Sequence, residues 1–132
     1  LAASTGYGGK IHFFGFVSDS DMEDLTMSAD VLVVPSVYEP FGIVALEGMA
    51  AGVPVIATNT GGLAEIIEHD KTGVLVYVRS PESIAWGVNR VLGDPGYAQW
   101  LTQNAKSKTK DIYSWENVAK ETVKVYEEAS KR

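Results

Sequence analysis

Residues 31–63 read VLVVPSVYEPFGIVALEGMAAGVPVIATNTGGL, and this stretch decides the fold. It begins with the apolar run 31–35, which is typical of a central parallel strand covered on both faces. Residues 41–51 are predicted to form a helix, because the Gly-Val-Pro sequence that follows them is typical of a helix end. A second strand, 53–58, precedes a glycine-rich turn. A strand, a helix and a strand in this order predict a parallel pair joined by a crossover helix.

The remainder of the chain extends this alternation in both directions. Two more apolar segments, 11–17 (IHFFGFV) and 74–78, are predicted as strands, and the first of them is expected to be buried. The order β-α-β-α-β-α-β, followed by helices, predicts an α/β fold with a Rossmann-like, doubly wound parallel sheet. The other helices are predicted at residues 19–28, 63–68, 81–92, 97–110 and 114–130.

The chain is predicted to be a single domain, residues 1–132, but a partial one. Four strands are predicted, and the strand at 11–17 is apolar enough to be flanked on both sides. An exposed edge of that kind is a liability for a folded protein. We therefore expect the strands that pair with it to lie in a missing N-terminal part of the same enzyme. An oligomer formed through the open sheet edge is the alternative.

Composition excludes several classes of site and partner. The chain is 45% hydrophobic and 21% charged, as in ordinary globular proteins, and its net charge of −6 argues against a broad surface for nucleic acid or anionic membrane. Without cysteine there are no disulfides and no thiolate metal sites, and His12 and His69 share no ligand spacing, so no metal is expected. Neither a signal peptide nor a transmembrane segment is visible, and a cytoplasmic location is expected.

Two glutamates mark the candidate site. Glu47 is the only ionisable residue between Pro40 and Ala64, and a lone carboxylate in so apolar a segment is expensive to bury without a hydrogen-bond partner. Glu39 lies where the preceding strand should end, and ligands of open α/β sheets bind outside the carboxyl ends of the strands. Taken singly, Glu39 could be a turn residue before Pro40, and Glu47 could bond only backbone or water. Together they favour a ligand site, since a carboxylate can accept both hydroxyls of a vicinal diol such as ribose.

Two backbone features lie beside these glutamates. The predicted helix begins near Phe41 and Gly42, and the free N–H groups of a first helical turn favour an anion or a hydroxyl oxygen. Gly42 has no side chain to block a ligand that approaches the backbone closely. The turn 60–62 offers a second set of N–H groups after the next strand, although a Gly-Gly turn is a weak signal by itself.

The segment EPFGIVALE, residues 39–47, resembles the E-x7-E motif of retaining nucleotide-sugar glycosyltransferases of the GT-B architecture, a group that includes glycogen synthase and sucrose-phosphate synthase. The match extends through PSVYEPFG, ALEGMAAGVPVIAT, TGGLAEII and TGVLV, and so covers nearly the whole chain. The resemblance implies an enzyme of two Rossmann-like domains with the active site in the cleft between them. This chain is similar to the second half of the C-terminal, donor-binding domain.

The resemblance also implies roles for individual residues. Glu47 matches the second glutamate of the motif, which in the family holds the ribose hydroxyls. Glu39 matches the first, the catalytic glutamate that lies beside the donor sugar and its leaving diphosphate. Phe41, Gly42 and Ile43 match the residues at the helix start whose backbone N–H groups contact sugar hydroxyls or phosphate.

The turn Thr60, Gly61 and Gly62 matches a further substrate-binding loop, closer to the acceptor. The resemblance implies a nucleoside diphosphate sugar as donor substrate, with no cofactor besides. Reaction with retention is generally discussed as a front-face displacement, which has no obvious protein nucleophile. Its catalysis would depend on positioning and on stabilising the leaving phosphate.

The chain departs from the family pattern in its positive charges. The family neutralises the diphosphate with an arginine and a lysine from an earlier loop of the same domain, whereas residues 11–70 contain neither residue type. Lys10 precedes its predicted strand and lies at the wrong edge of the sheet. A cation from outside this chain is therefore expected.

The resulting prediction is the donor-binding part of a retaining hexosyltransferase. It would transfer glucose or mannose to a glycan or other acceptor, and the chain alone would be inactive or nearly so. The alternatives are a non-catalytic Rossmann-like interaction module and a nucleotide-binding protein that performs no transfer.

Overall fold

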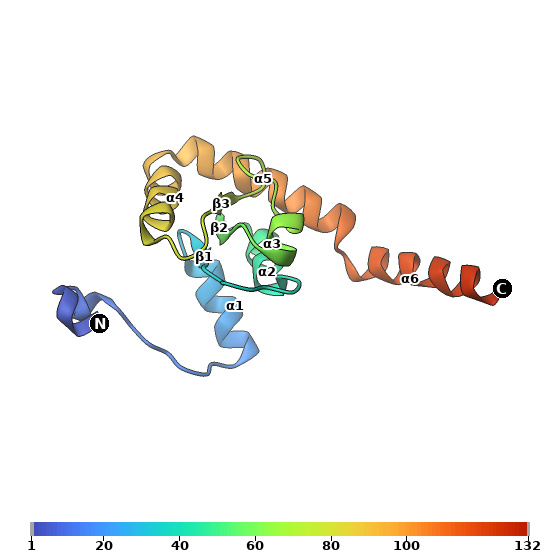
Figure 1. The fold of residues 1–132 in the computed structure, drawn as a ribbon, viewed down its shortest axis with the longest axis horizontal. Helices are drawn as coiled ribbons and strands as arrows, with labels where there is room; N and C mark the ends of the chain where they lie inside the picture. The colour runs from blue at the N-terminus through green and yellow to red at the C-terminus, as the bar shows by residue number, and fades with distance from the viewer. Residues whose placement is uncertain (1, 132) are drawn as a thin grey trace.

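The computed structural model describes residues 2–131, whose centre is a three-stranded parallel sheet (Figure 1). The strands are β1 (Leu32–Val34), β2 (Val55–Thr58) and β3 (Val74–Val76), and their order in the sheet is β1-β2-β3. Val34 pairs with Ala57, which in turn pairs with Leu75. Because the three strands are parallel and in this register, their carboxyl ends lie side by side at one edge of the sheet.

The described chain has six α-helices, and four of them are capped by a side chain as the sequence directs; α6 projects away from the sheet (Figure 1). Ser18, Ser80, Asp94 and Ser114 each accept a hydrogen bond from a backbone N–H of the first turn that follows. The helices are α1 (Asp19–Ser28), α2 (Ile43–Ala51), α3 (Gly61–Ile66), α4 (Pro81–Gly93), α5 (Pro95–Ile112) and α6 (Trp115–Ser130), and two 3-10 helices, η1 (Ala2–Thr5) and η2 (Gly8–Lys10), precede them.

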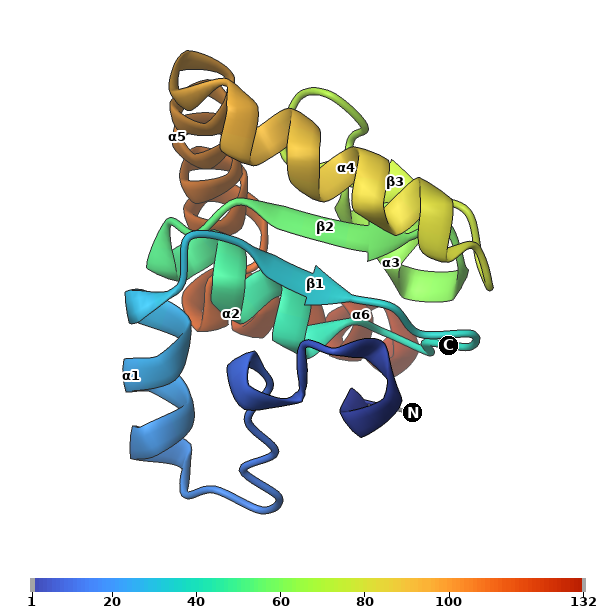
Figure 2. The same cartoon turned by 90° about the vertical axis from the view of Figure 1, so that its left-hand side faces the viewer.

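The sheet is covered on both faces, which confirms the predicted doubly wound α/β fold. On one face, side chains of β1 and β2 pack with Met49 of α2 and Leu63 of α3. On the other, Ile56 and Val74 pack with Val91 of α4. Helix α5 contributes a buried residue to each core and lies beside the amino ends of β1 and β2 (Figure 2). The strands are short, and apolar packing on both faces of the sheet stabilises them more than a long ladder of hydrogen bonds does.

The predicted strand at residues 11–17 is wrong. This segment is not assigned to a strand, and it runs as an extended chain away from the sheet (Figure 1). Its aromatic side chains lie in solvent, with Phe13 84% and Phe16 99% exposed. A strand requires a partner for its backbone groups, and among residues 2–131 the only strand that pairs with β1 is β2. The edge strands of the described sheet are therefore β1 and β3, and the predicted edge at 11–17 has no strand to form it.

None of the helices within residues 2–131 combines the length and the apolar character that crossing a bilayer requires.

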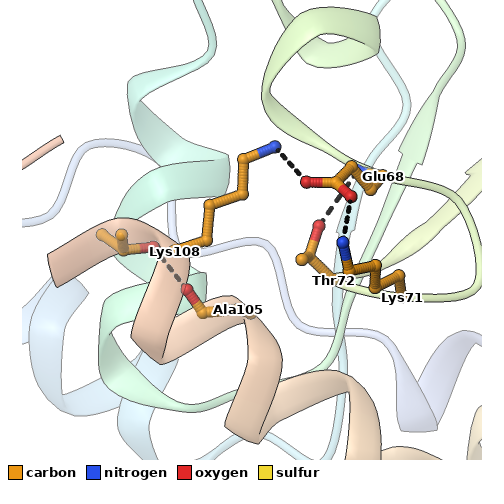
Figure 3. A network of polar contacts seen from close by, with 6 residues as sticks. Glu68, Lys71, Thr72, Ala105 and Lys108 are labelled. Atoms are coloured by element: carbon orange, nitrogen blue, oxygen red, sulfur yellow. Dashed lines mark hydrogen bonds and ion pairs between the residues drawn. The ribbon is translucent and has the colours of Figure 1, made fainter. Parts of the chain in front are cut away.

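A network of charges ties the α3–β3 loop to α5 (Figure 3). The carboxylate of Glu68 accepts hydrogen bonds from Lys71 Nζ at 2.7 Å and from Lys108 Nζ at 2.9 Å. The backbone N–H of Glu68 donates to the hydroxyl of the buried Thr72 at 3.0 Å. The hydrogen bonds from Lys71 and Lys108 lower the pKa of Glu68 to about 2. Loop and helix are thus held together by a carboxylate that has to stay ionised.

This network predicts an acid-sensitive contribution to stability. The pKa of Glu68 is about 2 in the folded chain and 4.5 as the ordinary value, so its contribution is complete above pH 4.5 and is lost as the pH falls toward 2. We expect Lys108→Met to lower the melting temperature by about 1–4 °C at pH 7, and this difference to disappear near pH 2. Thermal unfolding followed by circular dichroism from pH 2 to 7 measures both values.

The matched control is Lys110→Met on the same helix. Lys110 is exposed and makes no ion pair with any residue from 2 to 131. Its replacement should leave the melting temperature unchanged at every pH. A Lys108→Met deficit that stays constant down to pH 2 would show that Glu68 is not the partner that matters.

Candidate functional site

The fold brings two of the predicted loops together at the carboxyl edge of the sheet. The loop between β1 and α2 carries Glu39, and the turn between β2 and α3 contains Thr60. Their contact is direct, because the backbone N–H of Gly62 donates to the carbonyl oxygen of Glu39 at 2.9 Å. The hydroxyl of Thr60 also donates to the carbonyl of Val37, at 3.3 Å. Figure 2 shows both connections beyond the carboxyl ends of the strands, where ligands of such sheets bind.

The start of α2 offers free hydrogen-bond donors. Its N-cap is Gly42, in the left-handed conformation with a φ of 101°, and no side chain caps the helix. The backbone N–H groups of Gly42, Ile43 and Val44 find no acceptor among residues 2–131. These donors carry the partial positive charge of a helix N-terminus. A phosphate or a sugar hydroxyl is a suitable partner for them.

Two of the predicted site residues frame this helix start with exposed apolar side chains. Phe41 is 53% and Ile43 is 59% exposed, while Gly42 between them is buried against the side chains of Leu63 and Ile66. The helix start therefore packs against α3 on one side and is exposed to solvent on the other.

Glu39 lies in the loop that ends at this helix start. Its side chain is half-buried, and its Oε2 atom accepts a hydrogen bond from Ser36 Oγ at 3.3 Å. The carbonyl oxygen of Ser36 in turn accepts from the hydroxyl of Thr58, at 2.5 Å. Ser36 and Thr58 were not among the residues predicted from the sequence. Their positions at the ends of two neighbouring parallel strands were the available signal.

Glu47 is placed differently from what the sequence suggested. It is the fifth residue of α2, and its side chain is exposed, so no burial cost has to be offset. The residues of α2 that face the sheet are Ala45, Gly48 and Met49. The carboxylate of Glu47 makes no hydrogen bond or ion pair with any residue from 2 to 131, and it is free to bind a ligand. At 1.5 Å per residue it lies about 6 Å along the helix axis from the first residue.

The two glycines of the turn are required by the backbone that passes over them. A Cβ atom on Gly61 would lie 2.1 Å from the carbonyl oxygen of Glu39, and one on Gly62 would lie 2.1 Å from that of Phe41. The N–H of Gly62 already donates to Glu39 and is not available to a ligand. The predicted substrate contacts of Thr60, Gly61 and Gly62 remain a prediction.

One cation at this edge of the sheet was missed in the sequence. Arg79 comes three residues after the end of β3, whose carboxyl end lies beside that of β2. It is exposed and has a φ of 58°, a left-handed conformation that few residues other than glycine adopt. Its guanidinium makes no ion pair with any residue from 2 to 131. Its position just past a predicted strand was the signal that could have found it.

The groups with shifted pKa values lie at the opposite edge of the sheet. Burial disfavours the charged form of Asp70, but the Tyr97 hydroxyl and the charges of His69 and Arg90 outweigh it and lower the pKa of Asp70. Burial and the Asp70 carboxylate raise the pKa of Tyr97. Asp70, in the loop before β3, thus pairs with Arg90 of α4 and Tyr97 of α5, and these contacts hold the loop to the two helices. Among residues 2–131 there is also no cluster of three acidic, histidine or cysteine side chains that could hold a metal ion.

Comparison with known proteins agrees with this geometry. Residues 1–108 match the family model of glycosyl transferases group 1. The chain belongs to this family. An uncharacterized glycosyltransferase of Methanocaldococcus jannaschii is 54% identical to this chain over 126 residues, which are 96% of this chain and 32% of the relative. A glycogen synthase of Mycobacterium tuberculosis is 40% identical over 114 residues, 86% of this chain and 28% of the relative.

Solved structures show the same similarity in three dimensions. Sucrose-phosphate synthase of Thermosynechococcus elongatus superposes with a TM-score of 0.90 at 33% identity, over 98% of this chain and 33% of that one. HepE of Anabaena in complex with UDP-glucose superposes with a TM-score of 0.84 at 26% identity, over 99% of this chain and 35% of that one. The resemblance to relatives of glycogen synthase and sucrose-phosphate synthase is thus confirmed. The chain spans about a third of the length of these proteins.

The conformation of Gly42 gives a prediction about stability. In Gly42→Ala the alanine would have to adopt the left-handed backbone conformation of Gly42, and its Cβ would lie 3.0 Å from Leu63 Cδ2. We expect the free energy of unfolding to fall by about 1–3 kcal/mol, as measured by urea denaturation. Gly93→Ala is the control, because a Cβ at the end of α4 meets nothing within 4 Å. That variant should be unchanged or more stable by up to about 1 kcal/mol; equal losses in both variants would contradict the strained helix start.

Proposed function

We propose that this chain is the donor-binding part of a retaining glycosyltransferase. The enzyme would transfer a hexose, glucose or mannose, from a nucleoside diphosphate sugar to a glycan or another acceptor. The observation that supports the proposal most is the uncapped start of α2, whose three free N–H groups lie next to Glu39 at the carboxyl edge of the sheet. The UDP-glucose bound by the structurally similar HepE is a ligand of the same class.

Each part of the site has a role in this proposal. The N–H groups at the start of α2 receive phosphate or sugar oxygens of the donor. The exposed carboxylate of Glu47 accepts hydrogen bonds from the two ribose hydroxyls, which are a natural pair of donors for it. Glu39, held through Ser36, lies beside the donor sugar and its leaving group.

The reaction then depends on positioning and on charge. The bond from the anomeric carbon to the acceptor oxygen forms on the same face as the bond to the diphosphate that breaks, and the acceptor proton passes to the departing phosphate oxygen. No protein nucleophile takes part, and the donors at the helix start stabilise the charge that develops on the leaving group. No cofactor is needed besides the donor substrate.

Electrostatics limit what this chain does by itself. A nucleoside diphosphate is an anion, whereas Glu39 and Glu47 are negative and Arg79 is the one basic residue that we place at this edge within residues 2–131. We propose that further cations and the acceptor site come from other parts of the same enzyme, whose relatives are about three times as long. A cytoplasmic location remains a prediction from the sequence.

A titration with nucleotide sugars tests the ribose assignment. Calorimetry with UDP-glucose and GDP-mannose should show that Glu47→Gln weakens binding by about 10- to 100-fold, because hydrogen bonds to a charged acceptor are lost. A 2′-deoxy donor, which keeps only one of the two ribose hydroxyls, should show a smaller difference between the wild type and the variant. Glu23→Gln on α1, another exposed carboxylate, is the control and should change nothing.

Two results would oppose the proposal. If UDP and UDP-glucose bind with the same affinity, the chain recognises the nucleotide and not the sugar. If Glu47→Gln binds both donors like the wild type, Glu47 does not hold the ribose.

A transfer assay tests the expected inactivity of the isolated chain. With a radiolabelled hexose donor and a glycan acceptor, we expect no product above the rate without protein, since the cations and the acceptor site are proposed to lie elsewhere. Glu39→Gln serves as the background control. Turnover by the 132-residue chain that Glu39→Gln abolishes would refute the expectation of inactivity and support the catalytic role of Glu39.

A further inference from the structure

Three donors at the end of β2 bind the loop that carries Glu39. The hydroxyl of Thr58 donates to the carbonyl of Ser36, the hydroxyl of Thr60 donates to the carbonyl of Val37, and the N–H of Gly62 donates to the carbonyl of Glu39. The distances are 2.5, 3.3 and 2.9 Å. We call Thr58, Thr60 and Gly62 the three loop donors. Thr58 ends β2, Thr60 is the N-cap residue of α3, and Gly62 lies in the first turn of α3.

The acceptors of these bonds belong to a loop with few other backbone partners. Beyond β1, the carbonyls of residues 36, 37 and 39 are outside the strand ladder, which ends where Val34 pairs with Ala57. An unpaired buried backbone group costs free energy, so the loop conformation in which these donors bond its carbonyls is favoured. Thr58 is 1% exposed, and its hydroxyl also donates to the carbonyl oxygen of Val34 at 3.4 Å. The bond that it makes to Ser36 is therefore shielded from competing water.

The two segments pack backbone against backbone, so no side chain fits between them at Gly61 or Gly62. The missing side chains of Gly61 and Gly62 leave room for the carbonyl oxygens of Glu39 and Phe41, each of which would lie 2.1 Å from an added Cβ. The glycines are thus explained by contact with the protein's own loop. A ligand that approaches their backbone is not needed to account for them.

We propose that the three loop donors are positioning residues for Glu39 and for the start of α2. They fix the main chain of residues 36–39, and Ser36 then orients the Glu39 carboxylate through its own hydroxyl. The loop continues directly into the free N–H groups at Gly42, so the same contacts set the direction of these groups. The consequence for donor binding rests on the proposed function, whereas the mechanical role does not.

Amide hydrogen exchange of the 132-residue chain tests the mechanical role without any ligand. Thr58→Val keeps the shape of the buried side chain and removes its hydroxyl. We expect the amide of Gly62, which donates to the Glu39 carbonyl, to exchange about 2- to 10-fold faster, relative to the amides of residues 68–75, as for the loss of one hydrogen bond. Thr58→Ser restores the donor and should return the ratio to that of the wild type.

Thr72→Val is the matched control for this experiment. Thr72 is as buried as Thr58, at 2% exposed, and its hydroxyl also bonds backbone, but it lies in the loop before β3. Its loss should speed exchange at residues 68–75 and leave the Gly62 amide unchanged. The proposal is overturned if Thr58→Val leaves the ratio between the Gly62 amide and residues 68–75 unchanged, or if Thr72→Val alters the Gly62 amide as strongly. Should Thr58→Val fail to fold, Thr60→Val on the half-buried next donor gives the same comparison.

A second measurement separates this proposal from the proposed function. Calorimetry with UDP-glucose should show that Thr58→Val weakens binding by a factor close to that seen in exchange, that Thr58→Ser restores it, and that Thr72→Val has no effect. The calorimetry uses the longer enzyme that contains this chain, because further cations are proposed to lie outside it. If that enzyme binds no nucleotide sugar, the proposed function fails while the exchange result still decides the mechanical role. If binding is unaffected although the Gly62 amide exchanges faster, the three loop donors hold the loop but do not position it for the donor.

Discussion

The contact between the Gly62 N–H and the Glu39 carbonyl is the one on which the candidate site depends. It joins the ends of two strands that are distant in sequence, and it forms only because the parallel register sets Val34 beside Ala57. The chain then continues for a few residues beyond each strand, and the two extensions meet backbone to backbone. Such a close approach tolerates no Cβ atom at Gly61 or Gly62. This hydrogen bond, those from Thr58 and Thr60, and two missing side chains therefore place the loop before α2.

Capped and uncapped helices leave different groups available to a ligand. In α1, α4, α5 and α6 a serine or aspartate satisfies the first turn, through Ser18, Ser80, Asp94 and Ser114. At α2 the N-cap is a glycine, and three N–H groups are left without an acceptor among residues 2–131. Unsatisfied donors of this kind reduce the stability of a free protein and become useful when a ligand supplies the acceptor.

Charge is distributed in the same way. At the edge near the start of β3, Glu68 and Asp70 are satisfied by lysines, an arginine and a tyrosine, and their pKa values are lowered accordingly. At the carboxyl edge, Glu47 and Arg79 have no charged partner within residues 2–131. A shifted pKa would therefore have directed attention to the wrong edge. Here it marks groups whose partners are already in the protein, while the groups available to a ligand are the exposed ones.

The sequence by itself determined the alternation of strands and helices, the family, the approximate bounds of the helices and the placement of Glu39 and Gly42 at a strand end. These features depend on local chemistry: apolar periodicity, capping side chains and glycine. Only the tertiary structure decided three other points. Residues 11–17 carry strand-forming side chains but form no strand, because pairing requires a partner that a local pattern cannot reveal. Glu47 is exposed, because the faces of α2 are set by packing on the sheet. The N–H of Gly62 is occupied by a carbonyl that is distant in sequence, and only the register of two parallel strands brings them together.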